Sequence, residues 1–499
     1  MKRPLVIAAI SLLLASFLSL YGNLLLATLL PFSVACGALV FTATSRISAV
    51  KNLVVLILVG LVLLRLALFM ADVNNRSGQL EGKKLTVEGE VTQILSRSDS
   101  YTRFGIKVSD CKEEAARGIT VSATAYEVVD LIPGEQVVST VYFSKVNEQY
   151  KSAYFGEGYY YTCSVRDVTV VGENRFSVHG FAHHVTDRVK QGISSSGEPY
   201  INDLLVALVI GDDSNLSPLL NYNSRATGVS HMLVVSGMHL GIICGILMRI
   251  LSRFAGRRTV AIMLIPSVLF ILVICFFQLS VIRAAVAYLV MLASRLFTKD
   301  YDGLCSLAFG VIATMLLFPS VFYSVAFMLS VTATYAVIEP SDLIIKVTTP
   351  KSMNFIQKFL FGIWEIFVIS FAALICTLPV SVPAFGYISV ISPIANLIVT
   401  FMTNYALILG VLGAVLSFIP YLGGALSFIP FWLARVLLVL FVGIISNMSN
   451  LRHNLAFIDE NKNIYCILVT LAFILIVRIV CTRIVKERRR DPNARRTFA

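Results

Sequence analysis

The chain has 499 residues, of which 57% are hydrophobic and 14% are charged, and its formal net charge is +12. In a soluble domain about a quarter of the residues are usually charged, so this composition excludes an ordinary soluble protein. The charge does not indicate a partner such as nucleic acid by itself, because residues 78–177 hold 11 Lys plus Arg against 14 Asp plus Glu, a balance of −3. The excess positive charge therefore belongs to the apolar part of the chain and its loops.

Apolar runs long enough to cross about 30 Å of hydrocarbon predict a polytopic α-helical membrane protein with about 12 spans. The first run, in "MKRPLVIAAISLLLASF", also resembles a signal peptide, but two further apolar runs follow it, so we favour a retained anchor. The predicted spans cover residues 5–21, 24–43, 53–70, 231–250, 260–278, 281–297, 304–319, 321–338, 359–379, 388–413, 426–448 and 463–482.

Basic residues in the short loops predict the orientation, because such loops stay on the cytoplasmic side. If Lys2 and Arg3 start inside, the other loop cations fall on the same face, which places both termini in the cytoplasm and residues 71–200 outside. These cations are Arg46, Lys51, Arg253, Arg257, Arg258, Arg295, Lys299, Lys346, Lys351 and those of the tail "KERRR".

The outside segment alternates apolar and polar residues, as strands do. "KLTVEGEV", "RFGIKV", "GITVSATAY", "EQVVSTVYF" and "YTCSVRDVTVV" predict five short strands, and hence a small extracytoplasmic β-barrel of which the oligonucleotide-binding (OB) type is one architecture. Cys111 and Cys163 are the only cysteines there. We predict that they form a disulfide, which requires an oxidising compartment, and two unpaired thiols are the alternative.

Aromatic residues crowd the stretch "EQYKSAYFGEGYYYT" just before the last predicted strand. Tyr150, Tyr154 and Tyr159 could stack on nucleic-acid bases if they are exposed. The alternative, which we favour, is that these rings belong to the barrel core and to an aromatic belt at the membrane surface.

Residues 178–230 predict a linker followed by an amphipathic helix that lies at the membrane interface. In "GDDSN", Asp212 and Asp213 could bind a metal, but a solvated turn is commoner in such a context. His179 and His183 have the spacing of some zinc ligands without an accompanying acidic or Cys ligand. We therefore predict neither a metal site nor a cofactor, and the sequence holds no GxxxxGK[ST] loop for nucleotide hydrolysis.

"HMLVVSGMHLG" places ionisable and small residues inside a predicted span. His231 and His239 are eight residues apart and would share one helix face, with His239 near the bilayer midplane, where an ionisable group by default marks a polar pathway. Gly237 and Gly241 begin a small-residue stripe that permits close helix packing. Ser236 with His239 also allows an intramembrane serine hydrolase, although three residues apart on one helix is an awkward geometry.

Two further features mark the later spans. Arg283, in "LSVIRAA", lies near the outer end of a span and has no acid nearby in the sequence, so it must find a bundle interior, water or a partner anion, and we expect it to have no structural role. Prolines 379, 383 and 393 interrupt the apolar stretch 377–399, as happens where backbone lines a cavity.

The segments "GDDSNLSPLLNYNSRATGVSHMLVVSGMHLG", "LSVIRAA" and "FGYISVISPIANL" resemble the ComEC-type competence DNA-uptake channel family over most of the chain. The resemblance implies a bacterial inner-membrane channel, not an enzyme, that passes single-stranded DNA during natural transformation. It also implies an outside DNA receptor and a cytoplasmic ATPase or helicase motor as partners. A homodimer is allowed. Along the path we expect phosphates to meet cationic and small residues, namely Arg225, His231, Ser236, Gly237, His239, Gly241, Arg283 and Asn396.

The chain departs from the family pattern in that 17 residues follow Thr482 and no HxHxDH motif is present. We therefore expect a form without the metallo-β-lactamase-like domain, and a separate protein as the nuclease. The alternatives to the channel are a transporter of another solute and the hydrolase. The expected division is 1–70 N-terminal helices, 71–177 β-domain, 178–230 linker and interfacial helix, 231–482 channel domain and 483–499 basic cytoplasmic tail.

Overall fold

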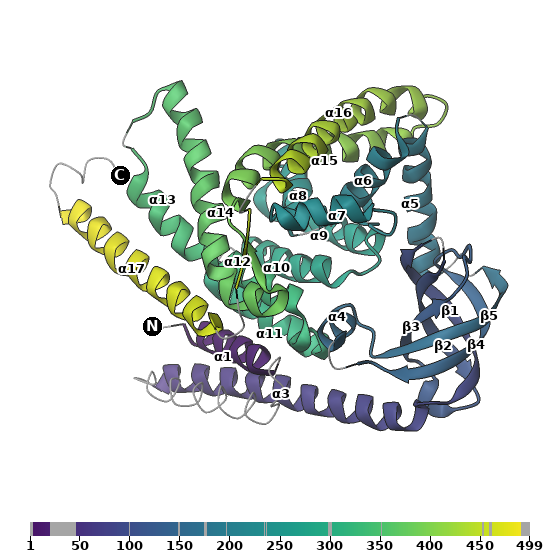
Figure 1. Ribbon diagram of the computed structural model, residues 1–499. Coiled ribbons are helices and arrows are strands. Elements are labelled where there is room, and N and C mark those ends of the chain that lie inside the picture. Colours follow the sequence, from purple (N-terminus) through teal and green to yellow (C-terminus); the bar gives the residue numbers. More distant parts are fainter. Residues whose placement is uncertain are drawn as a thin grey trace. The chain divides into compact units, whose positions relative to one another are not determined.

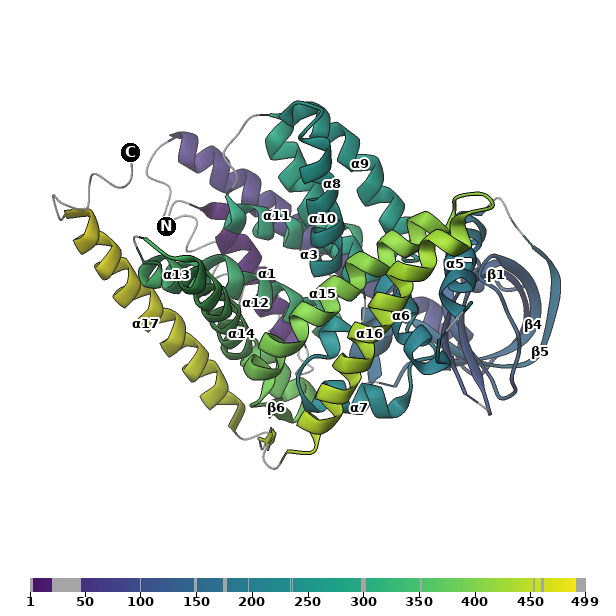
Figure 2. The ribbon, with the colours of Figure 1, turned by 90° about the horizontal axis from the view of Figure 1, so that it is seen from above.

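The structure is a computed structural model (Figures 1 and 2). It describes residues 3–19, 46–98, 100–147, 150–173, 177–195, 197–233, 235, 237–297, 302–350, 352–451, 454–458 and 462–490. These residues form two compact units. The first unit comprises Met1–Ser217, Met232–Phe327 and Asn404–Val439, and the second comprises Pro218–His231, Met328–Thr403 and Leu440–Ala499.

Five strands of the first unit close into a β-barrel, as predicted (Figure 1). The strand order is β1-β2-β3-β5-β4, with β4 returning to β1, and only β3 and β5 run parallel. Side chains at every second position point inward, so Val87, Val91, Phe104 and Ile106 are buried in the barrel core. The strands are β1 (Lys84–Arg97), β2 (Thr102–Cys111), β3 (Thr120–Ala125), β4 (Glu135–Lys145) and β5 (Tyr161–Glu173).

The disulfide considered for Cys111 and Cys163 is absent, and both are free, buried cysteines. Cys111 ends β2, which pairs with β1 and β3, whereas Cys163 lies in β5, which pairs with β3 and β4. The two cysteines are therefore on strands that do not neighbour each other. Each packs in the apolar core as a small hydrophobic side chain.

Non-reducing mass spectrometry is accordingly expected to find no peptide in which Cys111 is linked to Cys163. Burial raises the pKa of the Cys163 thiol to about 12, and only the thiolate reacts with an alkylating reagent. Alkylation of Cys163 should therefore require denaturant. A linked peptide from protein purified without reductant would contradict the structure.

The helix α3 (Arg46–Leu80) leads directly into the barrel and is longer than the predicted span 53–70. Its last residue, Leu80, is part of the barrel core. The helix α1 (Pro4–Ser19) matches the first predicted span and packs on α3 and α11 (Gly303–Leu317). The predicted span 24–43 falls outside the described residues.

Among the remaining helices of the first unit, α8, α9 and α10 pack on one another, and Figure 2 shows them gathered together. The side chains between these three include Leu240, Leu264 and Leu292. The elements are α4 (Lys151–Gly156), α5 (Val178–Ser194), α6 (Pro199–Ile210), α8 (Gly237–Leu251), α9 (Arg257–Ile274), α10 (Leu279–Leu296) and the 3-10 turns Glu114–Ala116 and Pro319–Tyr323.

The helix α6 does not fit the expected interfacial helix, because eight of its residues are buried. It is apolar all round, and such a helix is stable only when other elements cover every side of it. The helix α5 is the amphipathic one: Gly180, Ala182, Thr186, Val189 and Ile193 are buried while its other side chains remain more exposed. Ser177 caps its N-terminus, because its Oγ accepts from the Gly180 amide at 2.9 Å.

In the second unit, α14 packs on α17. The helix α14 continues through Pro379 and Pro383 and ends at Gly386, whose φ of +74° suits glycine. The elements of this unit are α7 (Pro218–Ala226), a 3-10 turn (Ser230–Met232), a π-helical turn (Val337–Ser341), α13 (Asp342–Thr348), α14 (Phe355–Phe385), β6 (Tyr387–Ser389), β7 (Leu455–Phe457) and α17 (Asn463–Arg490). Three helices have residues in both units: α12 (Val325–Ala336), α15 (Ser392–Ser417) and α16 (Gly423–Ser449).

By length and apolar composition, seven helices of the described chain could cross a membrane, fewer than the predicted number of spans. Four more apolar helices have 10–17 residues: Pro4–Phe17, Pro199–Ile210, Gly237–Leu251 and Gly303–Leu317. The seven are Ala49–Leu80, Arg257–Ile274, Val325–Thr348, Phe355–Phe385, Ser392–Ser417, Gly423–Ser449 and Asn463–Val485.

Candidate functional site

The helix expected over residues 231–250 begins only at Gly237. His231 lies in the preceding 3-10 turn and is exposed, whereas His239 is the third residue of α8 and is 1% exposed. The two histidines therefore do not share one helix face, and His239 lies in the first turn of α8. Ser236 falls outside the described residues.

The glycines of α8 differ in how closely other residues approach them. A Cβ at Gly237 would lie 3.3 Å from the Cβ of Ala284 in α10, so glycine permits the close approach of these two helices. Around Gly241 and Gly245 a Cβ would meet nothing within 4 Å. The small-residue stripe therefore contributes to helix packing at Gly237, and it leaves open space beside Gly241.

Arg283, in the first turns of α10, contacts the beginning of α12. Its Nη1 donates to the carbonyl oxygen of Ala326 at 2.8 Å, and its guanidinium carbon lies 5.5 Å from the centre of the Phe327 ring. The expectation that Arg283 has no structural role is therefore wrong. A carbonyl oxygen and an aromatic face can hold a guanidinium in place while its charge is retained.

In the second unit, the segment after α7 is fixed to the junction of β6 and α15. The Oγ of Ser389 donates to the carbonyl oxygen of Ala226 at 2.9 Å, and the Oγ of Ser392 donates to that of Gly228 at 3.5 Å. A Cβ at Gly228, where φ is +74°, would lie 2.6 Å from the Cβ of Ser392. The turn that presents Arg225 and His231, both exposed, is thereby held close to α15.

Asn396 belongs to the same cluster. Its Nδ2 donates to Ser392 Oγ at 3.4 Å, and its Oδ1 is buried without a hydrogen-bond partner among the described residues. Asn223 of α7 accepts from Ser449 Oγ at 2.9 Å. Through Ser392 and Gly228 the structure thus joins the turn between Arg225 and His231 to the segment of Asn396, which lies more than 160 positions further along the chain.

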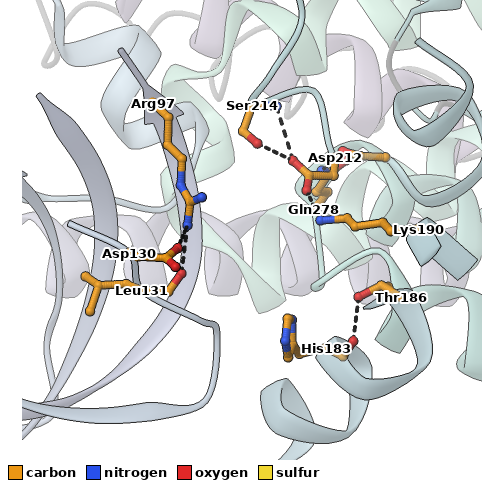
Figure 3. A network of polar contacts seen from close by, with 10 residues as sticks. Arg97, Asp130, Leu131, His183, Thr186, Lys190, Asp212, Ser214 and Gln278 are labelled. Atoms are coloured by element: carbon orange, nitrogen blue, oxygen red, sulfur yellow. Dashed lines mark hydrogen bonds and ion pairs between the residues drawn. The ribbon is translucent and has the colours of Figure 1, made fainter. Parts of the chain in front are cut away.

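The "GDDSN" loop between α6 and α7 is tied to α5 (Figure 3). Lys190 Nζ lies 2.5 Å from Asp212 Oδ2, and Asp212 Oδ1 accepts from the hydroxyl and amide of Ser214 at 2.6 and 3.2 Å. Asp213 is exposed. Both oxygens of Asp212 are therefore engaged in a turn, as favoured from the sequence.

Within the described residues, no three or more His, Cys, Asp or Glu side chains are grouped to hold a metal ion. His179 Nδ1 lies 3.3 Å from Glu90 Oε1 of the barrel. The main-chain carbonyl of His183 accepts from the hydroxyl of Thr186 at 3.0 Å (Figure 3). The i, i+4 pair His179 and His183 thus lies on α5, and among the described residues no third metal ligand is grouped with the two histidines.

The Asp212→Asn variant is expected to be less stable than the wild type at pH 7 by about 1 kcal/mol. Burial alone would raise the pKa of Asp212, but Lys190 and the Ser214 hydrogen bonds hold that pKa below its ordinary value. The contribution of Asp212 is therefore present above the unfolded pKa of about 3.9, and it is lost as the pH falls through the lower folded pKa. Thermal unfolding of the purified protein at pH 7 and pH 3 measures it.

The matched control is Asp213→Asn, which removes the neighbouring exposed carboxylate. It should change the unfolding temperature little at either pH. A loss of stability in Asp212→Asn that is equally large at pH 3 would show that the ion pair is not the cause.

The three tyrosines considered for base stacking differ in exposure. Tyr150 is 56% exposed, whereas Tyr159 is 3% exposed and accepts a hydrogen bond from Gln93 Nε2 at 3.0 Å. Tyr154 is half-buried, with the guanidinium of Arg103 lying 5.7 Å from its ring centre. Tyr159 thus belongs to the packed interior, while Tyr150 and Tyr154 retain accessible surface.

Sequence reasoning missed Arg435 and Gln278. Arg435 is 7% exposed inside α16, where its guanidinium donates to Asn202 Oδ1 at 2.8 Å and to the carbonyl oxygen of Ile193 at 2.6 Å. The sequence could have identified Arg435, because it is a single arginine within an apolar run. Gln278, at the start of α10, had no comparable signal.

These helices, with the closed barrel, define an integral membrane protein of the polytopic helical class that carries a five-stranded β-barrel. The family model "Competence protein" matches residues 208–484, more than half of the chain, and the chain belongs to this family, the ComEC type. The matched region contains all eight residues expected along the path. Neither the curated proteins nor the solved structures contain a significant match to the chain.

Membership in the competence family gives the chain a role in DNA uptake during transformation. The prediction from the three sequence segments is confirmed at this level. Two of these segments meet in the structure, where "NSRATGVSH" contacts "YISVISPIANL" through Ser389 and Ser392.

Proposed function

We propose that the chain is an inner-membrane channel that passes one DNA strand into the cytoplasm and is not itself an enzyme. The observation that carries this proposal is the fixed turn that presents Arg225 and His231 beside Asn396, inside the family region. The exposed Arg225 on an anchored turn suits passing phosphates, because its charge attracts the strand, and His231 beside it can donate a hydrogen bond. A few separate cations also let it leave, which a dense basic lining would not.

Arg283 would supply a second cationic position, on α10 of the first unit. Gly237 and Gly241 would also line the path, with the open space beside Gly241 allowing a ligand to approach the backbone, and His239, which is almost fully buried, would lie behind them in α8. Ser236 completes the proposed set. The hydrolase alternative would need the Ser236 hydroxyl within hydrogen-bond reach of His239, which is almost fully buried.

The barrel would serve as the outside domain, with residues 1–70 before it, residues 178–230, which contain α5, α6 and α7, after it, the channel domain at 231–482 and the tail at 483–499. The basic loops support an orientation with both termini in the cytoplasm. We propose that the barrel is of the OB type, because a closed five-stranded barrel with the order β1-β2-β3-β5-β4 supports that topology. Tyr150 and Tyr154 would then offer rings to the bases of a single strand.

Inward movement of a strand requires work, which a channel does not supply. We therefore propose a cytoplasmic ATPase or helicase as motor, an outside receptor that delivers DNA, and a separate nuclease that removes the second strand. A homodimer is compatible with the proposal.

The test is entry of DNA into cells that carry or lack the chain, with a duplex labelled on one strand or on the other. Cells that lack the chain should bind the duplex at the surface but admit no label. Cells that carry it should admit label from one strand only. Equal entry with and without the chain would reject the channel, and entry of both strands would reject its single-strand character.

A further inference from the structure

A small cavity of about 120 Å³ lies within the first unit, beside the barrel. Thr92 of β1, Glu157 after α4 and His179 of α5 contribute polar walls, and Phe276, Phe277 and Gln278 of the α9–α10 turn complete it. Pockets for drug-sized ligands measure about 300–1,000 Å³. This cavity therefore suits one small planar group and not a whole nucleotide.

The turn that brings the two phenylalanines to the cavity is strained. Phe276 has a φ of +49° and Phe277 a φ of +55°, a region that residues with a side chain seldom adopt. Hydrogen bonds from the Phe276 amide to Val273 at 3.0 Å and from the Phe277 amide to Leu272 at 3.1 Å hold the turn. Strained residues that persist in a fold cluster at ligand sites.

The side chain of Gln278 is fixed in one orientation. Its Nε2 donates to the carbonyl oxygen of Gly211 at 2.8 Å, next to the Asp212 loop in Figure 3, and this bond determines which end of the amide is oxygen. The Oε1 is buried and has no hydrogen-bond partner among the described residues. A buried acceptor of this kind is costly unless a ligand or water donates to it.

We propose that this cavity, the Gln278 pocket, binds a single nucleobase that bears an exocyclic amino group, which donates to Gln278 Oε1 while the ring contacts Phe277. The inference rests on the proposed function, since it assumes that a single strand passes the barrel. Glu157, which is exposed, and Thr92, whose hydroxyl is buried, also line the cavity and provide further acceptors for an amino group. Phe277 is 39% exposed, so its ring is accessible to a base.

The test measures fluorescence anisotropy of labelled oligo(dC), oligo(dT) and an abasic strand of equal length, with the full-length protein in nanodiscs at low salt. The wild type should bind oligo(dC) about tenfold tighter than oligo(dT), as one hydrogen bond to an otherwise unsatisfied acceptor allows, because thymine has no amino group. Phe277→Gly, which suits the positive φ, and Gln278→Met should reduce that preference to about twofold or less.

The matched controls are Phe254→Ala and Gln79→Met, which alter exposed residues far from the cavity in sequence, and both should keep the preference. Affinity for the abasic strand should be the same in all five proteins. Equal wild-type affinity for the three strands, or a preference that survives both pocket variants, overturns the Gln278 pocket and leaves the channel proposal standing. Failure of the wild type to bind any strand overturns both.

Discussion

Replacement of Arg283 by alanine is expected to reduce DNA uptake about a hundredfold or more. The guanidinium is positively charged at every physiological pH and offers several donors in one plane, which suits a phosphate. Alanine removes this charge from α10 and also removes the bond to the carbonyl of Ala326 and the contact with Phe327. Some loss of protein abundance is therefore expected together with the loss of uptake.

Two further variants separate the charge of Arg283 from its structural bond. Arg283→Gln keeps a donor that can reach a carbonyl oxygen but has no charge, so it should restore abundance and not uptake. Arg283→Lys keeps the charge without the planar fork, and partial uptake would indicate a point-charge role. Uptake of labelled DNA is compared at matched protein level, with Arg295→Ala at the other end of α10 as the control. Normal uptake in Arg283→Gln would remove the charge from the proposed pathway.

Local patterns in the sequence were sufficient for the strands of the barrel. The alternation in "KLTVEGEV" and "RFGIKV" repeats every two residues, and Val87, Val91, Phe104 and Ile106 are buried as this period requires. The closure of the barrel is different, since the pairing of β1 with β4 joins residues about fifty positions apart in the chain. No local pattern could distinguish the two cysteines in non-neighbouring strands from a bonded pair.

The helices were predicted less accurately where polar and apolar stretches meet. Residues 72–80 of α3 are mostly polar, so hydropathy ended the span at 70 although the helix continues to Leu80. Conversely, "HMLVVSG" is apolar enough to count as part of a span, but its first residues, His231 and Met232, lie in a 3-10 turn and α8 begins only at Gly237. Hydropathy describes burial in a membrane and does not determine where main-chain hydrogen bonds start.

The candidate site shows the same limit for long-range contacts. Arg225 and Asn396 were chosen because they lie in segments that resemble one family, and their common cluster depends on Ser389 and Ser392. The partner of Arg283 was not predictable, because the carbonyl of Ala326 belongs to the main chain and is 43 positions away. Any residue type could have supplied that acceptor.

Arg435 is the second arginine with a large expected effect, and its contacts indicate a structural role. It is 7% exposed and connects α16 to Asn202 of α6 and to the end of α5 at Ile193. The Arg435→Ala substitution removes the guanidinium donors, which leaves two buried acceptors without them: the side-chain oxygen of Asn202 and the carbonyl oxygen of Ile193. It also creates a cavity. We expect a loss of about 3 kcal/mol in stability, with lower abundance.

Thermal unfolding of the purified protein and its abundance in membranes measure this effect. Arg258→Ala, at an exposed position in α9, is the control and should leave both unchanged. Arg435→Met restores most of the volume but not the donors, so its stability should lie between those of Arg435→Ala and the wild type. If Arg435→Ala is instead as stable and abundant as the wild type but takes up no DNA, Arg435 belongs to the path of the strand. In that case the charge that matters for uptake would lie on α16, at Arg435, and not on α10, at Arg283.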